Sequence, residues 1–226
     1  EAFLKEANQL NSIELEGLYS HFATADEGDL SYANSQLSKF NEVVKIAKKL
    51  DIYPTFIHCS NSGAILNVKE SRFNMVRAGM LLYGAFPSDE VPQELPIKPV
   101  MTFTAPVVEI RDVKAGTHIS YGGVYTTKSD TRIAVVQAGF ADGVPRPWYI
   151  DGFVKFKNQN FKITGRICMD QLMIDIGSAD IQYGDEVLIF GSNEHGSIDI
   201  NHIAKKIDST SYVLVTAIGI RPKRVY

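Results

Sequence analysis

The organisation of the chain changes near residue 98, and this change limits the possible folds more than any other feature of the sequence. Residues 1–85 alternate between apolar segments with helical spacing and short segments rich in strand-forming residues. Beyond residue 98, strand-like segments follow one another with turns between them. Alternation of strands with helices is typical of a parallel α/β arrangement, whereas consecutive strands indicate an antiparallel β unit. The sequence therefore predicts an α/β unit over 1–90, followed by a β-rich unit over 91–226.

The first unit is expected to contain two helices, over 1–10 and 32–50, because apolar residues there fall on one helical face. Strands are expected over 13–26, within 54–64 and over 73–84, and the strand within 54–64 should run into a loop of small polar residues. Polar residues gather at the carboxyl ends of these strands, where parallel α/β folds place their functional sites.

The second unit is expected to be a set of short strands with a hairpin turn at Asn158-Gln159-Asn160. A short helix should follow Ser197, and a last helix should lie within 210–219. The boundary between the units falls near 86–99, which carries four prolines. The strand-like segments are VMTFTAPVVEI, GTHISYG, TRIAVVQAGFADG, GFVKFKNQNFKITGRI, DQLMIDIG and DEVLIFG.

The number of strands in the first unit raises a physical problem. About three strand–helix units precede residue 98, whereas a closed parallel barrel needs eight strands. Three strands leave open edges and an uncovered face. Either further strands come from another segment, or the first unit is a small open sheet. Because the chain begins in a helix-like segment without a methionine, we expect it to be cut from a longer protein.

Charge and composition exclude several classes of function. The net charge of −3 gives no overall attraction to nucleic acid or to an anionic membrane. No apolar run approaches the roughly 20 residues that a membrane span needs, and residues 1–30 do not have the pattern expected of a signal peptide. Cys59 and Cys168 form no disulfide framework and indicate a reducing compartment. We expect a cytoplasmic protein that binds neither nucleic acid nor membranes.

A few residues at turns are candidates for chemistry. Tyr121 lies between a serine and two glycines in THISYGG, either as an aromatic residue beside a β-turn or as a phenol held as an acid or base. Ser62, Arg77 and Gly79 lie where a barrel binds phosphate through a hydroxyl, backbone N–H groups and a glycine that permits close approach. Ordinary connecting loops would give the same pattern.

The histidines and aspartates give weaker signals. His21 ends a strand and is either a hydrogen-bonded structural residue or a catalyst. His58 stands beside a cysteine, but two ligands do not make a metal site, so no metal is predicted. Asp142 and Asp170 lie at turns, where aspartate is expected for backbone reasons.

Taken together and in order, a series of motifs resembles the pyridoxal-phosphate-dependent alanine racemases over nearly the whole chain. The resemblance implies the last units of a (β/α)₈ barrel followed by a mostly antiparallel β domain. It also implies a homodimer in which the barrel of one subunit meets the β domain of the other. The motifs are HFATAD, NSGA, VRAGMLLYG, ISYGGVYTT, GFADGVPR, GRICMDQLMIDIG and GDEVLIFG.

By this resemblance, Tyr121 is one of two catalytic bases that exchange the Cα proton of an amino acid from opposite faces. His21 and Arg77 match positions that build a cationic network near the cofactor, and Arg77 also matches the arginine that faces the pyridine nitrogen of pyridoxal phosphate. Phosphate contacts are implied for Ser62, Gly79 and Met80, whereas Met169 and Asp170 match partner-subunit residues near the substrate carboxylate. The implied activity is interconversion of L- and D-alanine, which supplies D-alanine for peptidoglycan.

The departures from the family pattern leave alternatives open. The cofactor lysine in a KANAYGHG-type stretch and the arginine in a GMGRLG-type stretch have no counterpart, so we expect this segment alone to be inactive. Phe140 replaces a tyrosine that lines the substrate entrance, and Ile220 replaces a tyrosine that contacts the phosphate. A serine racemase of the same family and a non-catalytic, degenerate racemase that acts as a binding protein are the alternatives.

Overall fold

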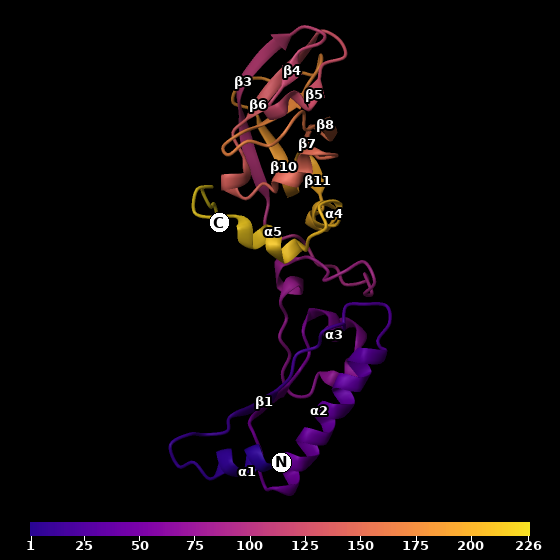
Figure 1. The fold of residues 1–226 in the computed structure, drawn as a ribbon, viewed down its shortest axis with the longest axis vertical. Helices are drawn as coiled ribbons and strands as arrows, with labels where there is room; N and C mark the ends of the chain where they lie inside the picture. The colour runs from indigo at the N-terminus through magenta and orange to yellow at the C-terminus, as the bar shows by residue number, and fades with distance from the viewer. The chain divides into compact units, whose positions relative to one another are not determined.

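The computed structural model describes all 226 residues, Glu1 to Tyr226. The chain divides into two compact units, Glu1–Lys98 and Pro99–Tyr226 (Figure 1). Both units combine helices with strands, but their sheets differ in kind, because the first is parallel and the second is antiparallel. None of the helices is long and apolar enough to cross a membrane.

The first unit is built around two short parallel strands. Strand β1 pairs with strand β2 in the register Gly17↔Phe56, Leu18↔Ile57 and Tyr19↔His58. The parallel pairing agrees with the prediction for this unit, although each strand has only three residues. The elements are α1 (Ala2–Asn8), β1 (Gly17–Tyr19), α2 (Ser31–Lys49), β2 (Phe56–His58), α3 (Ser62–Asn67) and the 3₁₀ turns η1 (Lys69–Ser71) and η2 (Met80–Tyr83).

Helix α2 forms because its apolar residues recur at intervals of three and four, which places them on one face. That face packs against β1, β2 and the start of α3, in a core that includes Phe22, Cys59 and Val68. Lys48 and Lys49 end the helix, where positive charge is favoured by the helix dipole. The buried residues of α2 are Ala33, Leu37, Phe40, Val44 and Ala47.

Two predictions for the first unit are wrong. Residues 73–84 form no strand, and their one ladder-like bond runs from Arg77 N–H to Ser60 O at 2.9 Å. A strand needs a continuous partner, and β2 has already ended at His58. The polar loop predicted after β2 is helix α3, because the Asn61 side chain caps the first turn by accepting from Ala64 N–H at 3.0 Å.

The second unit is a seven-stranded sheet whose order is β8-β7-β10-β3-β6-β9, with β11 paired to β10. All of its pairs are antiparallel, as predicted for this region. Its strands are β3 (Phe103–Val113), β6 (Thr131–Val136), β7 (Phe153–Phe156), β8 (Gln159–Lys162), β9 (Leu172–Asp175), β10 (Glu186–Asn193) and β11 (Gly196–Ile198).

Smaller elements complete the second unit. The strands β4 (His118–Ile119) and β5 (Tyr125–Thr126) form a separate hairpin, and the 3₁₀ turn η3 (Tyr121–Gly123) lies between them. The 3₁₀ turns η4 (Phe140–Asp142) and η5 (Arg146–Tyr149) follow β6, and helices α4 (Ile200–Lys206) and α5 (Ser211–Ala217) lie near the C-terminus (Figure 1).

The hairpin turn between β7 and β8 lies one residue earlier than predicted. Lys157 and Asn158 form the turn, with φ of 47° and 64°, and Gln159 and Asn160 already belong to β8. A two-residue hairpin turn with positive φ at both positions matches the twist of the flanking strands. Because Phe156 pairs with Gln159, the core residue Phe161 keeps its side chain on the buried face.

Candidate functional site

Arg77 is the centre of a polar cluster at the carboxyl ends of β1 and β2. One of its terminal nitrogens donates to Ser20 O at 2.8 Å and lies 3.1 Å from His21 Nδ1, while the other hydrogen-bonds to His58 Nδ1. Its guanidinium carbon also lies 5.9 Å from the centre of the Tyr19 ring. The structure therefore brings together His21 and Arg77, the two residues that the sequence assigned to one network.

The two histidines of this cluster are acceptors toward Arg77. A guanidinium group has five N–H donors and no acceptor, so the ring nitrogens that face it are unprotonated. Burial, and to a smaller extent the charge of Arg77, lower the pKa of His58. The His58 ring also stacks on Tyr19, with the ring centres 5.5 Å apart. Two of the five Arg77 N–H groups take no part in the bonds to Ser20 and the histidines.

Ser62 and Gly79 form a second group of donors in the same unit. The buried Ser62 hydroxyl accepts from Gly79 N–H at 2.9 Å and from Leu81 N–H at 3.5 Å, which leaves its own proton available for donation. A Cβ atom on Gly79 would lie 3.6 Å from the Ser62 oxygen, in van der Waals contact with it. Met80 is buried directly after this glycine.

These donors fit a phosphorylated pyridine cofactor. The Ser62 hydroxyl, whose proton remains available for donation, suits a phosphate oxygen. The remaining N–H groups of Arg77 can donate to an unprotonated ring nitrogen. The hydrogen bonds of Arg77 and Ser62 include no carboxylate, which would repel an anionic ligand.

Tyr121 lies at the tip of the β4–β5 hairpin, and 69% of its surface is exposed. The residue before it, Ser120, has φ 65° and ψ −178°, a conformation that is otherwise almost confined to glycine. Two contacts hold this strained backbone: the Ser120 hydroxyl donates to Arg166 O at 2.6 Å, and its Cβ packs against Gly165 so closely that a side chain there would clash at 2.6 Å. Tyr121 follows directly after this strained residue, and most of its side chain is exposed.

Met169 and Asp170 lie on a tight turn over 168–171, which is closed by a hydrogen bond from Cys168 N–H to Gln171 O at 2.9 Å. Both residues are exposed. The same segment holds the Tyr121 hairpin through Ser120, whose oxygen also lies 3.6 Å from Cys168 Sγ. The structure therefore gathers all three candidate residues of the second unit around one segment.

The sequence did not identify Arg221 as part of the site, although its side chain links the turn that carries Asp170 to the turn that carries Asp142. Arg221 contacts Asp170 at 2.6 Å and Asp142 at 3.2 Å. The only signal in the sequence was the small basic cluster at the C-terminus, which also includes Lys223 and Arg224. Such a cluster does not show which acidic residues pair with it, because only the fold brings the partners close to it.

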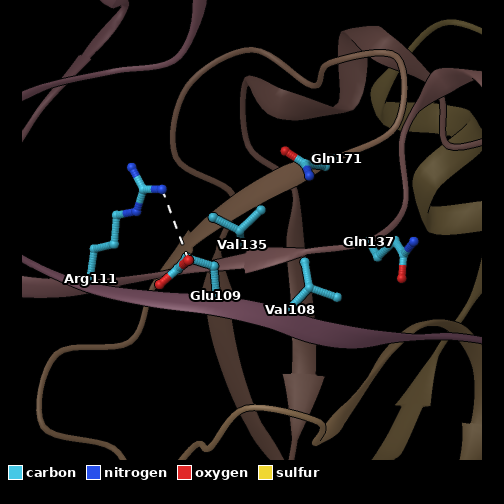
Figure 2. A pocket seen from close by; sticks show the side chains of 6 residues that line it. All are labelled: Val108, Glu109, Arg111, Val135, Gln137 and Gln171. Carbon is cyan, nitrogen blue, oxygen red and sulfur yellow. Dashed lines mark ion pairs between the residues drawn. The ribbon is translucent and has the colours of Figure 1, made fainter.

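A separate cavity of about 380 Å³ lies on the open face of the antiparallel sheet (Figure 2). Its walls carry an ion pair between Arg111 and Glu109 at 3.9 Å, and both side chains are largely exposed. None of the candidate residues from the sequence lines it. The lining residues are Val108, Glu109, Arg111, Val135, Gln137 and Gln171.

The fold and these clusters define a class of protein: a parallel α/β unit with donors suited to an anionic cofactor, joined in sequence to an antiparallel β unit that presents a tyrosine. Family models identify the class further. The alanine racemase N-terminal domain matches residues 1–87, and the alanine racemase C-terminal domain matches residues 100–226. The chain belongs to the alanine racemase family, as its motifs predicted.

Individual relatives agree with the family models. The chain is 40% identical over 225 residues to an alanine racemase of Halothermothrix orenii, covering 99% of this chain and 59% of that protein. The structure of alanine racemase from Clostridium difficile 630 is 38% identical, with a TM-score of 0.90 over 98% of this chain and 58% of its own. For alanine racemase from Streptomyces coelicolor A3(2), identity is 33% and the TM-score 0.94, over 100% of this chain and 60% of that one. The chain thus spans about three-fifths of the length of these relatives.

Proposed function

We propose that this chain provides the last strand–helix units of the barrel and the β domain of a pyridoxal-phosphate-dependent racemase that interconverts L- and D-alanine. The proposal is supported by matches to both family models in chain order and by relatives named alanine racemase at about 40% identity. The single observation that carries it furthest is the exposed Tyr121 on a strained backbone, because a proton-transferring group must reach a substrate.

The first unit would hold the cofactor. Ser62, Gly79 and the residues around Met80 would bind the phosphate, and Arg77 would donate to the pyridine nitrogen while His21 orients the guanidinium group. When bound, pyridoxal phosphate supplies an electron sink that makes the Cα proton of an amino acid acidic. A hydrogen bond from the Arg77 guanidinium group, which does not give up its proton, would leave the ring nitrogen unprotonated and the electron sink moderate, which favours racemisation over other reactions.

The second unit would supply the proton. In this proposal Tyr121 takes or returns the Cα proton on one face of the substrate, and a base on the opposite face completes inversion. The tyrosine, Met169 and Asp170 would act on the cofactor of a second copy of the chain, which makes the enzyme a homodimer with shared sites. The opposing lysine would come from a segment that these 226 residues do not include, so the segment alone would be inactive.

The test is replacement of Tyr121 by phenylalanine in the full-length protein that contains this segment. Loss of the hydroxyl should lower kcat/KM for alanine racemisation in both directions by about 10²–10⁴-fold, the usual contribution of a general acid or base. Tyr183→Phe is the matched control, because Tyr183 is a similarly exposed tyrosine of the same unit. Turnover near the wild-type level in Tyr121→Phe would refute the proposed role.

The substrate is proposed to be alanine rather than serine. Phe140, which matches the substrate-entrance position, is exposed and cannot donate a hydrogen bond to a substrate hydroxyl. A site built to hydrogen-bond a hydroxyl discriminates strongly for it, whereas an apolar surface does not. Comparison of kcat/KM for L-alanine and L-serine decides this point, and a preference for serine would overturn it.

A non-catalytic binding protein is the second candidate, because no lysine takes part in the hydrogen bonds that join Arg77, Ser62 and their neighbours. Intact mass of the full-length protein before and after borohydride reduction separates the two. An added mass equal to the reduced cofactor, attached to a lysine, would support the enzyme. A protein that binds no cofactor under saturating pyridoxal phosphate would support the binding protein instead.

A further inference from the structure

Two turns of the second unit meet backbone to backbone. The N–H groups of Phe140 and Ala141 donate to Cys168 O and Met169 O, each at 3.0 Å. The turns approach so closely at Gly139 that a Cβ atom there would lie 2.2 Å from Met169 O. The position of Met169 and its neighbour Asp170 is therefore tied to the 139–144 turn.

Asp142 closes the 139–144 turn and places a nearly buried carboxylate where this turn meets the 168–171 turn. Its carboxylate accepts from Gly139 N–H at 2.9 Å, which holds the turn in shape. The carboxylate is 13% exposed, and a charge with so little access to water is costly unless it has a partner of opposite sign. One oxygen is occupied by the backbone, so the other needs a cation.

Arg221 supplies that cation from the C-terminal segment of the chain. Its Nε lies 3.2 Å from Asp142 Oδ1, and its Nη2 lies 2.6 Å from Asp170 Oδ1. The two contacts use different nitrogens of one planar group, so the angle between the carboxylates is fixed as well as their distance. The bond to Asp170, followed by the charge of Asp142, raises the pKa of Arg221.

The surroundings of Arg221 contain other charges that do not make these contacts. Asp142, Asp170 and Arg221 line a cleft of about 630 Å³ together with Glu186 and Lys223. Glu186 accepts from the Thr104 hydroxyl at 2.7 Å, on the β3 side of the cleft. Lys223 is exposed on the same segment as Arg221, and it makes a matched comparison because it differs in its contacts and not in its charge.

We propose that Arg221 is a positioning residue that locks the 168–171 turn against the 139–144 turn, so that Met169 and Asp170 keep the geometry in which they face the substrate. The inference rests on the proposed function for the part that concerns substrate. The lock itself rests only on the contacts of Arg221, Asp142 and Asp170. Arg221 touches no reacting atom in this role.

The experiment compares Arg221→Gln, Arg221→Lys and Lys223→Gln in the full-length protein. Hydrogen exchange followed by mass spectrometry should show about fivefold faster exchange in peptides covering 139–144 and 166–171 for Arg221→Gln, a change typical of lost ion pairs that are partly exposed. Lys223→Gln should exchange as the wild type does. Arg221→Lys should restore part of the protection from exchange, since lysine keeps the charge but lacks the planar guanidinium group that contacts both carboxylates.

Kinetics then separates positioning from general stability. Arg221→Gln should raise KM for alanine about fivefold with a smaller change in kcat, because the substrate-facing turn moves while the proton-transferring groups remain. Exchange and KM equal to those of Lys223→Gln would overturn the proposal, as would faster exchange with an unchanged KM. A wild-type protein that does not racemise would refute the proposed function instead, and the exchange result alone would then decide whether the lock exists.

Discussion

At the scale of single residues, the site depends on side chains that set the state of their neighbours. Arg77 determines which nitrogen of His21 and His58 is unprotonated, because it can only donate. Ser120 has a strained backbone directly before the exposed Tyr121, and Gly165 leaves room for the Ser120 side chain. Ser120 and Gly165 act only through Tyr121, so replacing either of them changes the site without removing a group that would contact a ligand.

His58 gives a prediction about pH. Its pKa is lowered by burial and then by Arg77. The unfolded chain therefore binds the proton more readily, so stability is highest above the ordinary value of 6.5 and falls as the pH drops through that value. Replacing His58 with asparagine, whose oxygen can accept from Arg77 but does not titrate, should flatten this dependence.

Urea unfolding at about pH 5 and about pH 8 measures the effect. His118→Asn is the control, because His118 lies in the other unit and does not contact Arg77. If His58→Asn loses as much stability on acidification as the wild type does, another group is responsible.

At the scale of elements, the β7–β8 hairpin shows how turn chemistry and register are linked. Lys157 and Asn158 both have positive φ, which asparagine tolerates and lysine does not favour. Lys157→Asn should raise the free energy of unfolding by about 0.5 kcal/mol, since it removes backbone strain at the cost of a weak surface pair with Asp180.

Chemical denaturation of the wild type and the variant tests the hairpin prediction. Lys162→Asn, an exposed change within β8, should instead lower stability slightly, because asparagine is disfavoured in strands. Equal stability of Lys157→Asn and Lys162→Asn would show that the turn is not strained.

At the scale of the whole molecule, the two units differ in how well they are closed. The second unit has one large core beneath a seven-stranded sheet. The first has two small cores and a two-stranded sheet with an open edge on either side, and Tyr19 and Phe56 are exposed on its strands. Isolated two-stranded sheets are marginal in water, and open edges promote association.

The 226-residue chain should therefore lose its first unit before its second. Calorimetry should show two transitions, with residues 1–98 melting at the lower temperature and binding a hydrophobic dye. Residues 99–226 expressed alone should give the upper transition unchanged. A single cooperative transition for the whole chain, absent from both isolated units, would contradict this independence.

Particular residues show how far the sequence could be read in advance. The spacing of Leu37, Phe40 and Val44 predicted α2, because helical periodicity is local. The strand predicted at 73–84 was wrong, because its apolar residues have no continuous partner in this unit. The loop predicted after β2 is helix α3 instead, since a six-residue helix has little periodicity in its sequence and depends on the Asn61 cap.

Motif residues of the candidate site could be predicted from the sequence, whereas contacts between distant residues could not. Motifs identified Tyr121, Arg77 and Ser62 as candidates, and their roles remain proposals. The contact of Arg221 with Asp142 and Asp170 was not predictable, because the partners lie 79 and 51 residues away along the chain. Only the folded sheet brings the C-terminal segment to those turns.

By itself, the sequence determined the change from α/β to antiparallel β architecture, the main helix and the family, because periodicity and motifs are carried by neighbouring residues. Tertiary structure alone decided which nitrogens of the histidines face Arg77, how Gly165 and Arg166 hold the strained Ser120 before Tyr121, and how Arg221 joins two turns. These features depend on distances between residues that are remote in sequence, and only packing sets such distances.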